Sequence, residues 1–275
     1  TIRSSSAASD VYKRQAFSGL DEVVVPTLIE GDAVRVDVDL LEKEIRNGES
    51  TAVLATTTFF PPRESDPVKD IAKVCAGHDV PLVINNAYGV QSERVMGEVR
   101  AAVDAGRVDA VVQSSDKNFL APVGASIVVT PRKEFIDSIA DTYAGRATAA
   151  PVAQTLAALL AIGLNTYKDL QKEQLENKSL LEKLMNELAE KLDQRMLSVW
   201  NPVACAMTMD GLDVREIGAR LYNARVTGPR TVEKGGIGSS VDNYPHSYIV
   251  MNAAIGASKN DVKTATTKLY KEASK

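Results

Sequence analysis

Short runs of valine and isoleucine alternate with amphipathic helical patterns from Asp21 onward, and this alternation constrains the fold more than any other feature. The runs are continuously apolar, as is typical of strands buried on both faces of a mainly parallel sheet. The order predicts an α/β fold in which helices pack against such a sheet, with Asp66 as the N-cap of one of them. Strands are expected over 21–28, 51–58, 81–87, 108–115 and 125–130, and helices over 38–48, 66–79 and 132–143.

The pattern changes after Arg146. A long helical region is expected over 152–195, where a leucine stripe that includes Leu181 and Leu188 predicts packing inside its own domain. The later elements are a strand near 205–209, a helix over 213–223 and a final helix from Asn260. We therefore expect three parts: a disordered or foreign tail over 1–15, a large α/β domain over 16–165 and a small C-terminal α+β domain over 166–275.

The composition limits what the protein can bind. Lysine and arginine number 32 against 36 aspartate and glutamate, so the net charge of -4 excludes a surface that is basic throughout. Cys75 and Cys205 lie far apart without metal-ligand spacing, so we expect reduced thiols, no metal site and a cytoplasmic location. The uncharged stretch 147–167 is rich in alanine, which favours a buried helix over a membrane span.

Polar residues follow three of the expected strands, at the carboxyl edge where parallel sheets bind ligands. A lysine held there, such as Lys117, can act as a nucleophile toward carbonyls, although a solvated loop lysine is the commoner case. Asn85 and Asn86 need partners for their amides, which a ligand or a hydrogen-bonded turn would supply. Asn85 lies at a strand end about thirty positions before Lys117, which lies at the next strand end. This arrangement is typical of pyridoxal-phosphate enzymes, in which one residue contacts the pyridine nitrogen and the lysine bonds covalently to the cofactor.

Three central segments carry a family resemblance: INNAYGVQ at 84–91, VDAVVQSSDKNFLAPVGASIV at 108–128 and YAGRATAAP at 143–151. They resemble the O-phosphoseryl-tRNA(Sec) selenium transferase family. Further segments agree with that family in order: EGDAVRVDVDLLE, TTTFFPPR, GLNTYKDL, VTGPR and DNYP. The resemblance implies a fold-type-I pyridoxal-phosphate-dependent transferase, in which 16–165 is the C-terminal portion of the large cofactor-binding domain.

The resemblance also implies roles for single residues. Lys117 is similar to the lysine that bonds covalently to pyridoxal 5'-phosphate, and Asn85 to the residue that faces its pyridine ring. Arg146 is similar to the arginine that binds the substrate's phosphate, a role that suits a planar guanidinium. Ser114 and Thr57 are expected to be cofactor neighbours.

The activity implied by the resemblance is the conversion of O-phosphoseryl-tRNA(Sec) to selenocysteinyl-tRNA(Sec). In this hypothesis Lys117 removes the Cα proton, phosphate leaves Cβ with the help of Arg146, and selenophosphate supplies the selenium. A neutral Asn85 stabilises negative charge at Cα less than an aspartate would, which suits a reaction with a good leaving group at Cβ. The resemblance further implies a homotetramer with sites at dimer interfaces.

The sequence departs from the family in two respects. The family's N-terminal part is absent, so we expect a fragment that binds the cofactor weakly on its own and turns over little. Arginines that contact tRNA in relatives fall at Asp104 and Ala224. The candidate substitutes are Arg100 and Arg107 near the first position and Arg225 beside the second. Two alternatives stay open: another fold-type-I enzyme, such as a cysteine-forming phosphoseryl-tRNA enzyme, and a non-catalytic tRNA-binding relative.

Overall fold

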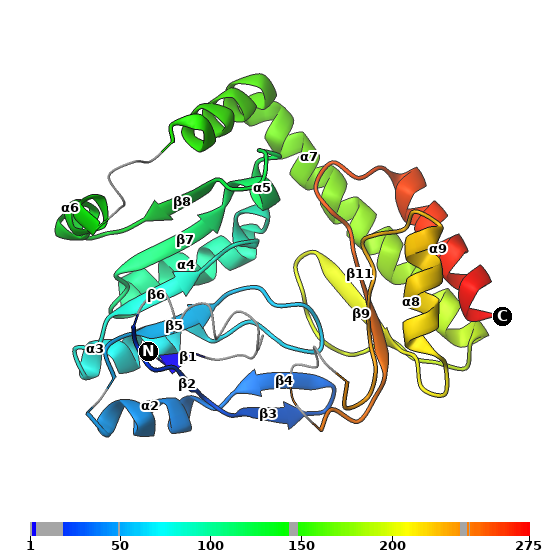
Figure 1. Cartoon of the computed structure of the whole chain (residues 1–275), viewed down its shortest axis with the longest axis horizontal. Coiled ribbons are helices and arrows are strands. Elements are labelled where there is room, and N and C mark those ends of the chain that lie inside the picture. Colours follow the sequence, from blue (N-terminus) through cyan, green and yellow to red (C-terminus); the bar gives the residue numbers. More distant parts are fainter. Residues whose placement is uncertain (1, 4–18, 49, 143–147, 237–240, 242) are drawn as a thin grey trace. The chain divides into compact units, whose positions relative to one another are not determined.

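The computed structural model describes residues 2–3, 19–48, 50–142, 148–236, 241 and 243–275, whose helices and strands are drawn in Figure 1. The chain divides into two compact units. Unit 1 comprises Thr1–Thr27, Val36–Thr58 and Ser65–Tyr167, and unit 2 comprises Leu28–Arg35, Phe59–Glu64 and Lys168–Lys275. The division after Tyr167 lies beside the boundary expected after residue 165, but unit 2 also includes two short segments from the first half of the chain.

Unit 1 contains a six-stranded sheet formed by β1 (Ile2–Arg3), β2 (Val23–Val24), β5 (Val53–Thr56), β6 (Leu82–Asn85), β7 (Ala110–Ser114) and β8 (Ser126–Val129). The strand order is β2-β1-β5-β6-β7-β8, and neighbours are parallel except for β8, which runs antiparallel to β7. The mainly parallel α/β fold predicted from the sequence is therefore confirmed. Of the tail expected over 1–15, Ile2 and Arg3 form strand β1, and the other residues lie outside the described part of the chain.

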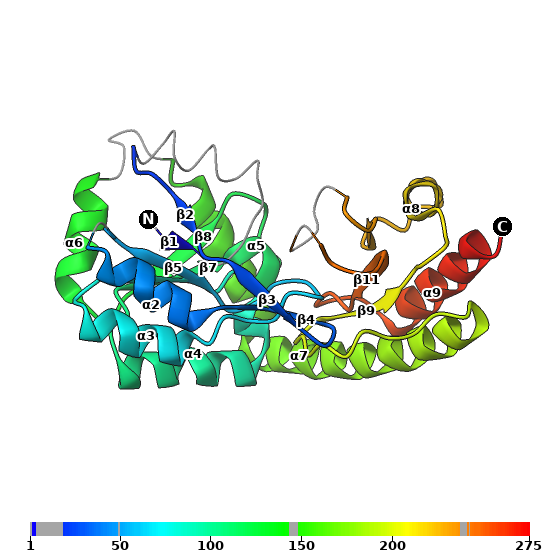
Figure 2. The same ribbon diagram turned by 90° about the horizontal axis from the view of Figure 1, so that it is seen from below.

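Three helices cover one face of this sheet, as Figure 2 shows: α2 (Val38–Arg46), α3 (Val68–Gly77) and α4 (Glu93–Ala105). Their apolar side chains, such as Ile71 and Ala102, join Leu82 and Ile84 of β6 in one buried cluster. Burial of such side chains is the main favourable contribution to the stability of the unit. The cluster holds the strands in register, and so it positions the residues at the ends of those strands.

Asp66 has a different role from the one expected. Helix α3 begins at Val68, with Pro67 at its N-cap position and no side-chain cap. The Asp66 carboxylate instead accepts the backbone N–H of Thr56 at 2.8 Å, and the Asp66 N–H donates to the Thr56 carbonyl at 3.0 Å. Asp66 therefore ties the loop before α3 to the carboxyl end of β5.

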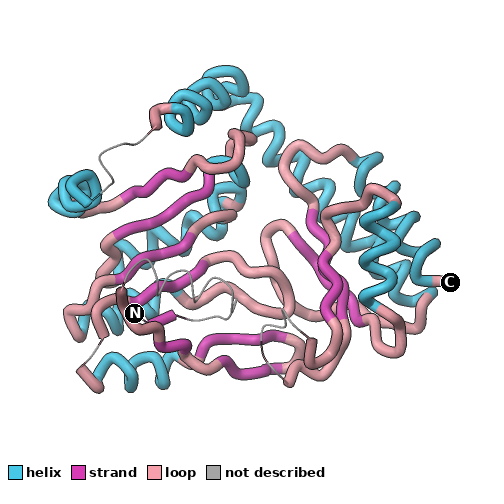
Figure 3. Tube along the Cα trace, in the orientation of Figure 1, coloured by secondary structure: helices cyan, strands magenta, loops and turns pink. Residues whose placement is uncertain are grey.

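Unit 2 contains an antiparallel sheet of β9 (Ala204–Thr208), β10 (Arg230–Val232) and β11 (Tyr248–Asn252), in the order β10-β11-β9. Its helices are α8 (Val214–Asn223), α9 (Lys259–Ala273) and the later part of α7 (Ala150–Lys191), all drawn in Figure 3. Gly163 interrupts α7 with a φ of 69°. Leu181 and Leu188 of α7 are buried in the same cluster as Met207 and Ile249. The leucine stripe therefore packs inside its own domain, as expected.

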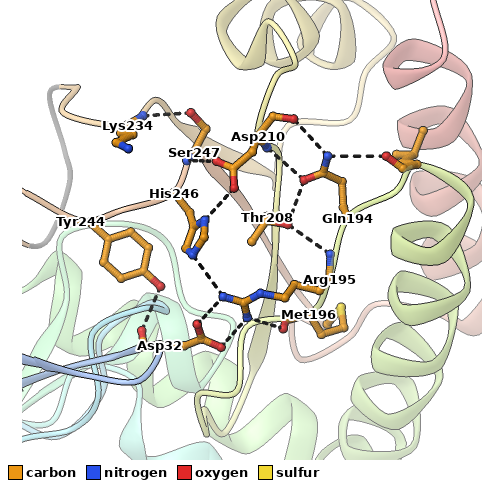
Figure 4. Close-up of polar contacts among 11 residues, drawn as sticks. Asp32, Gln194, Arg195, Met196, Thr208, Asp210, Lys234, Tyr244, His246 and Ser247 are labelled. Atoms are coloured by element: carbon orange, nitrogen blue, oxygen red, sulfur yellow. Dashed lines mark hydrogen bonds and ion pairs between the residues drawn. The ribbon is translucent and has the colours of Figure 1, made fainter.

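Strands β3 (Thr27–Glu30) and β4 (Ala33–Val36) form a separate two-stranded sheet, and Asp32 lies in the turn between them. The Asp32 carboxylate accepts two hydrogen bonds of 2.7 Å from Arg195, and the Tyr244 hydroxyl donates to the Asp32 carbonyl at 2.9 Å (Figure 4). The hydrogen bond from Arg195, despite the opposing effect of burial, lowers the pKa of Asp32. These contacts explain why this segment belongs to unit 2.

Helix α6 (Lys133–Thr142) follows β8 in unit 1. Among the described residues, no helix is both long enough and apolar enough to cross a membrane. The described residues also contain no group of three or more histidine, cysteine, aspartate or glutamate side chains that could hold a metal ion.

Gly106 lies where the end of α4 approaches α3, and it provides a test of this packing. A Cβ at Gly106 would lie 2.2 Å from the carbonyl oxygen of Ala72. We expect Gly106→Ala to lower the free energy of unfolding by about 2 kcal/mol, because the backbone of α3 would have to shift. Urea denaturation measures this change.

Gly97, inside α4, is the matched control. A Cβ at Gly97 would have nothing within 4 Å. Gly97→Ala is therefore expected to raise the free energy of unfolding by about 0.5–1 kcal/mol, because alanine favours the helix. The same stability change in both variants would contradict the close approach of α3 and α4.

Candidate active site at the carboxyl edge of the sheet

Asn85 lies on the face of the sheet opposite to α2, α3 and α4. Successive residues of a strand point to opposite faces, and the preceding Ile84 is buried in the helix-covered cluster. Asn85 itself is half-buried. Its register partners are Thr56 on β5 and Val112 on β7. These residues form a row at the carboxyl edge of the sheet, where α/β enzymes bind ligands.

Asn86 is a structural residue, in contrast to Asn85. It is fully buried, and its side-chain oxygen accepts the Thr57 hydroxyl at 2.6 Å. A Cβ at Gly89 would lie 1.7 Å from that same oxygen, so the close approach of the two segments requires glycine. Thr57, expected to be a cofactor neighbour, is also fully buried and uses its hydroxyl in this contact. Its role toward a cofactor stays a prediction.

Lys117 lies in the one-turn helix α5 (Ser115–Asn118), directly after β7. Its Nζ atom lies 4.7 Å from the centroid of the Tyr88 ring, a cation–π contact. Burial, together with the nearby Asp116 carboxylate, raises the pKa of Tyr88. Tyr88 lies three residues after Asn85, in the turn that follows β6. Its contact with Lys117 therefore shows that the fold brings the carboxyl ends of β6 and β7 together.

Two buried amides hold the backbone around Lys117. The Gln91 amide, from the 3-10 helix η1 (Gly89–Gln91), donates to the Lys117 carbonyl at 2.6 Å. The Asn118 amide donates to the carbonyls of Ala87 at 2.8 Å and Ser114 at 2.7 Å. Gln91 and Asn118 are 6% and 0% exposed, so water does not compete for these bonds. We call this arrangement the amide clamp.

Hydroxyl groups surround the same strand ends. Ser114, expected to be a cofactor neighbour, is half-buried and donates to the Asp116 carboxylate at 2.5 Å. The hydroxyls of Ser115 and Thr58 are buried and have no hydrogen-bond partner among the described residues. Buried hydroxyls are costly when unpaired, so these two are available to a polar ligand.

Three of the arginines singled out in the sequence have different surroundings. Arg146 lies outside the described residues. Arg107 is bonded to the Asp109 carboxylate at 3.0 Å and to Asp79 at 2.5 Å, which raises its pKa, mainly through the hydrogen bond to Asp109. Arg225 is exposed just after α8, with a φ of 60°. Unit 1 thus brings Asn85, Thr57, Ser114 and Lys117 together, whereas Arg225 belongs to unit 2.

Sequence reasoning missed the amide clamp. Gln91 and Asn118 both lie inside segments that were singled out, but their own roles were not recognised. A signal was present, because Asn118 is a polar residue between Lys117 and the apolar run that begins at Phe119. Its amide bond to Ala87 connects positions 31 residues apart, and such a pairing follows from the fold and not from local patterns.

The fold of this chain has counterparts among solved structures. The structure of Oryza sativa TDC with PLP matches it with a TM-score of 0.75 at 14% sequence identity, covering 99% of this chain and 60% of that chain. The chain has the fold of the fold-type-I pyridoxal-phosphate-dependent transferases, as predicted from its sequence.

The family follows from closer similarities. The family model described as O-phosphoseryl-tRNA(Sec) selenium transferase, SepSecS, matches residues 4–274. The Methanopyrus kandleri protein of that name is 45% identical over 271 residues, which are 97% of this chain and 63% of the relative. A crystal structure of archaeal O-phosphoseryl-tRNA(Sec) selenium transferase matches with a TM-score of 0.90 at 41% identity, covering 98% of this chain and 63% of that chain. The chain belongs to this family and spans less than two thirds of the length of these relatives.

Removal of the Asn118 amide tests the clamp. In Asn118→Ala the carbonyls of Ala87 and Ser114 lose their donor, so we expect the free energy of unfolding to fall by about 2 kcal/mol. Asn186→Ala is the control, because Asn186 is exposed on α7 and its amide donates to Glu190 at the surface. Urea denaturation compares the two variants, and an equally small change in both would show that the clamp does not hold the Lys117 turn.

Proposed function

We propose that the protein catalyses the pyridoxal-phosphate-dependent conversion of O-phosphoseryl-tRNA(Sec) to selenocysteinyl-tRNA(Sec), with selenophosphate as the selenium donor. The proposal is supported by the position of Lys117, whose backbone is held by the amide clamp next to the end of the strand that carries Asn85. It is also supported by the membership of this chain in the selenium transferase family. Lys117 is the residue in this arrangement that can bond covalently to an aldehyde.

The residues present fit pyridoxal 5'-phosphate. Lys117 offers an amine, Asn85 an amide on the face of the sheet opposite to α2, α3 and α4, and Ser115 and Thr58 two buried hydroxyls without partners among the described residues. Lys117 and Asn85 would hold the cofactor, with Ser114 and Thr57 as its neighbours. When bound, the cofactor stabilises negative charge that develops at the substrate's Cα.

The chain's own residues supply proton transfer and binding. The Lys117 amine removes the proton from Cα as general base, and the amide clamp keeps the backbone that carries this amine in place. The Cβ–O bond then breaks, and phosphate leaves with the electron pair. Arg146 is the residue that would bind the phosphate, since a guanidinium holds two phosphate oxygens at once. Selenium of selenophosphate then bonds to Cβ while the Lys117 ammonium returns the proton to Cα, and hydrolysis of the Se–P bond releases a second phosphate.

The partners are part of the proposal. Arg225 is the stronger candidate for contact with tRNA(Sec), because it is exposed, whereas the guanidinium of Arg107 is already bonded to two carboxylates. A homotetramer is supported by the exposed apolar side chains of α7, among them Val152, Leu156 and Leu160, which an assembly would cover. A cytoplasmic location fits a reaction on charged tRNA.

The proposed activity is tested by conversion of phosphoseryl-tRNA(Sec). The full-length protein that carries this sequence, supplied with pyridoxal phosphate and selenophosphate, is expected to form selenocysteinyl-tRNA(Sec). Lys117→Ala is expected to lower the rate by at least about a thousandfold, because general-base catalysis and the covalent bond are both lost.

Lys133→Ala is the control, since Lys133 is exposed on α6, and it is expected to retain the full rate. Product formed at the control rate by Lys117→Ala, or no product from the unmodified protein, would contradict the proposed function.

A further inference from the structure

We infer that Asn85 offers a hydrogen-bond donor, and not an acceptor, to the cofactor, and that it therefore keeps the pyridine nitrogen unprotonated. The inference rests on the proposed function, because it requires pyridoxal phosphate on the face of the sheet that carries the Asn85 side chain, with its pyridine nitrogen toward that side chain. It concerns which reactions the site favours once the cofactor is there.

The orientation of the Asn85 amide follows from its local contact. The side-chain oxygen of Asn85 accepts the backbone N–H of Ala87 at 3.2 Å. Only the oxygen of a carboxamide can accept a hydrogen bond, so this contact decides which end of the group is oxygen. The amide nitrogen, with its two N–H donors, lies at the other end.

The partner that fixes this orientation is itself held in place. The carbonyl of Ala87 accepts the Asn118 amide at 2.8 Å, as part of the amide clamp. The next residue, Tyr88, is in contact with the Lys117 amine. The peptide group that carries the Ala87 N–H is held as well, because its Asn86 carbonyl accepts the Gly89 N–H at 3.2 Å. The Ala87 N–H therefore stays directed at the Asn85 oxygen.

The consequence for a pyridine nitrogen is electrostatic. An unprotonated nitrogen has a lone pair and accepts an N–H donor, whereas a protonated nitrogen would place its own N–H against the donor of Asn85. A carboxylate at this position would do the reverse and stabilise the protonated ring.

An unprotonated ring withdraws less charge from Cα, so it favours substrates whose Cβ leaving group departs as the Cα proton is removed. Asn85 is therefore a specificity-determining residue. It favours phosphoserine, with its phosphate leaving group, over amino acids that lack one.

The test uses the full-length protein loaded with pyridoxal phosphate that carries ¹⁵N in the ring, and it reads the ¹⁵N NMR shift of the ring nitrogen. We expect the resonance of neutral pyridine at neutral pH. Asn85→Asp keeps an oxygen for the Ala87 N–H but replaces the donor with an acceptor, so its resonance is expected to move to the position of pyridinium. Asn260→Asp adds the same charge in the first turn of α9 and is expected to match the unmodified protein.

The outcomes separate this inference from the proposed function. Failure of the full-length protein to take up the labelled cofactor would overturn the proposed function and this inference with it. Uptake with a pyridinium resonance in the unmodified protein would overturn the inference alone. If Asn85→Asp does not fold, the resonance of the unmodified protein still decides between the two protonation states.

Discussion

The amide bonds of Gln91 and Asn118 fix the turn that follows β7 to the turn that follows β6, and the candidate site depends on this link. The two turns lie at the carboxyl edge of one sheet, but parallel strand pairing alone leaves their conformations open. Buried amide donors determine them, because the carbonyls that they bond cannot turn to water. The link places the Lys117 amine against Tyr88 and orients the Asn85 side chain through Ala87.

The parts of the fold that the sequence predicted are those governed by local patterns. Continuous valine and isoleucine runs indicated the parallel strands, and the leucine stripe of α7 indicated a helix packed on its own domain. The polar ends of β6 and β7 could also be recognised, because polar residues next to buried strands are costly unless they form hydrogen bonds. Asn85 and Lys117 were found in this way, together with a family resemblance.

The rest depended on contacts that no local pattern reveals. Asn85 and Asn86 are adjacent and chemically identical, yet Asn85 lies on the face opposite to α2, α3 and α4, whereas Asn86 is buried and packs against Gly89. A shift of one residue in register would exchange them. Asp66 fits the pattern of an N-cap but bonds to Thr56, and Asp32 belongs to unit 2 because Arg195 binds its carboxylate. Thr56 and Arg195 lie ten or more positions from these aspartates in the sequence.

The central claim is that the Lys117 amine bonds covalently to pyridoxal phosphate. Borohydride reduction makes such a bond permanent, and peptide mapping then locates the modified lysine. With the full-length protein, the account predicts that the label lies on the peptide that contains Lys117. A label on any other lysine, or no label in protein that has been mixed with the cofactor, would contradict it.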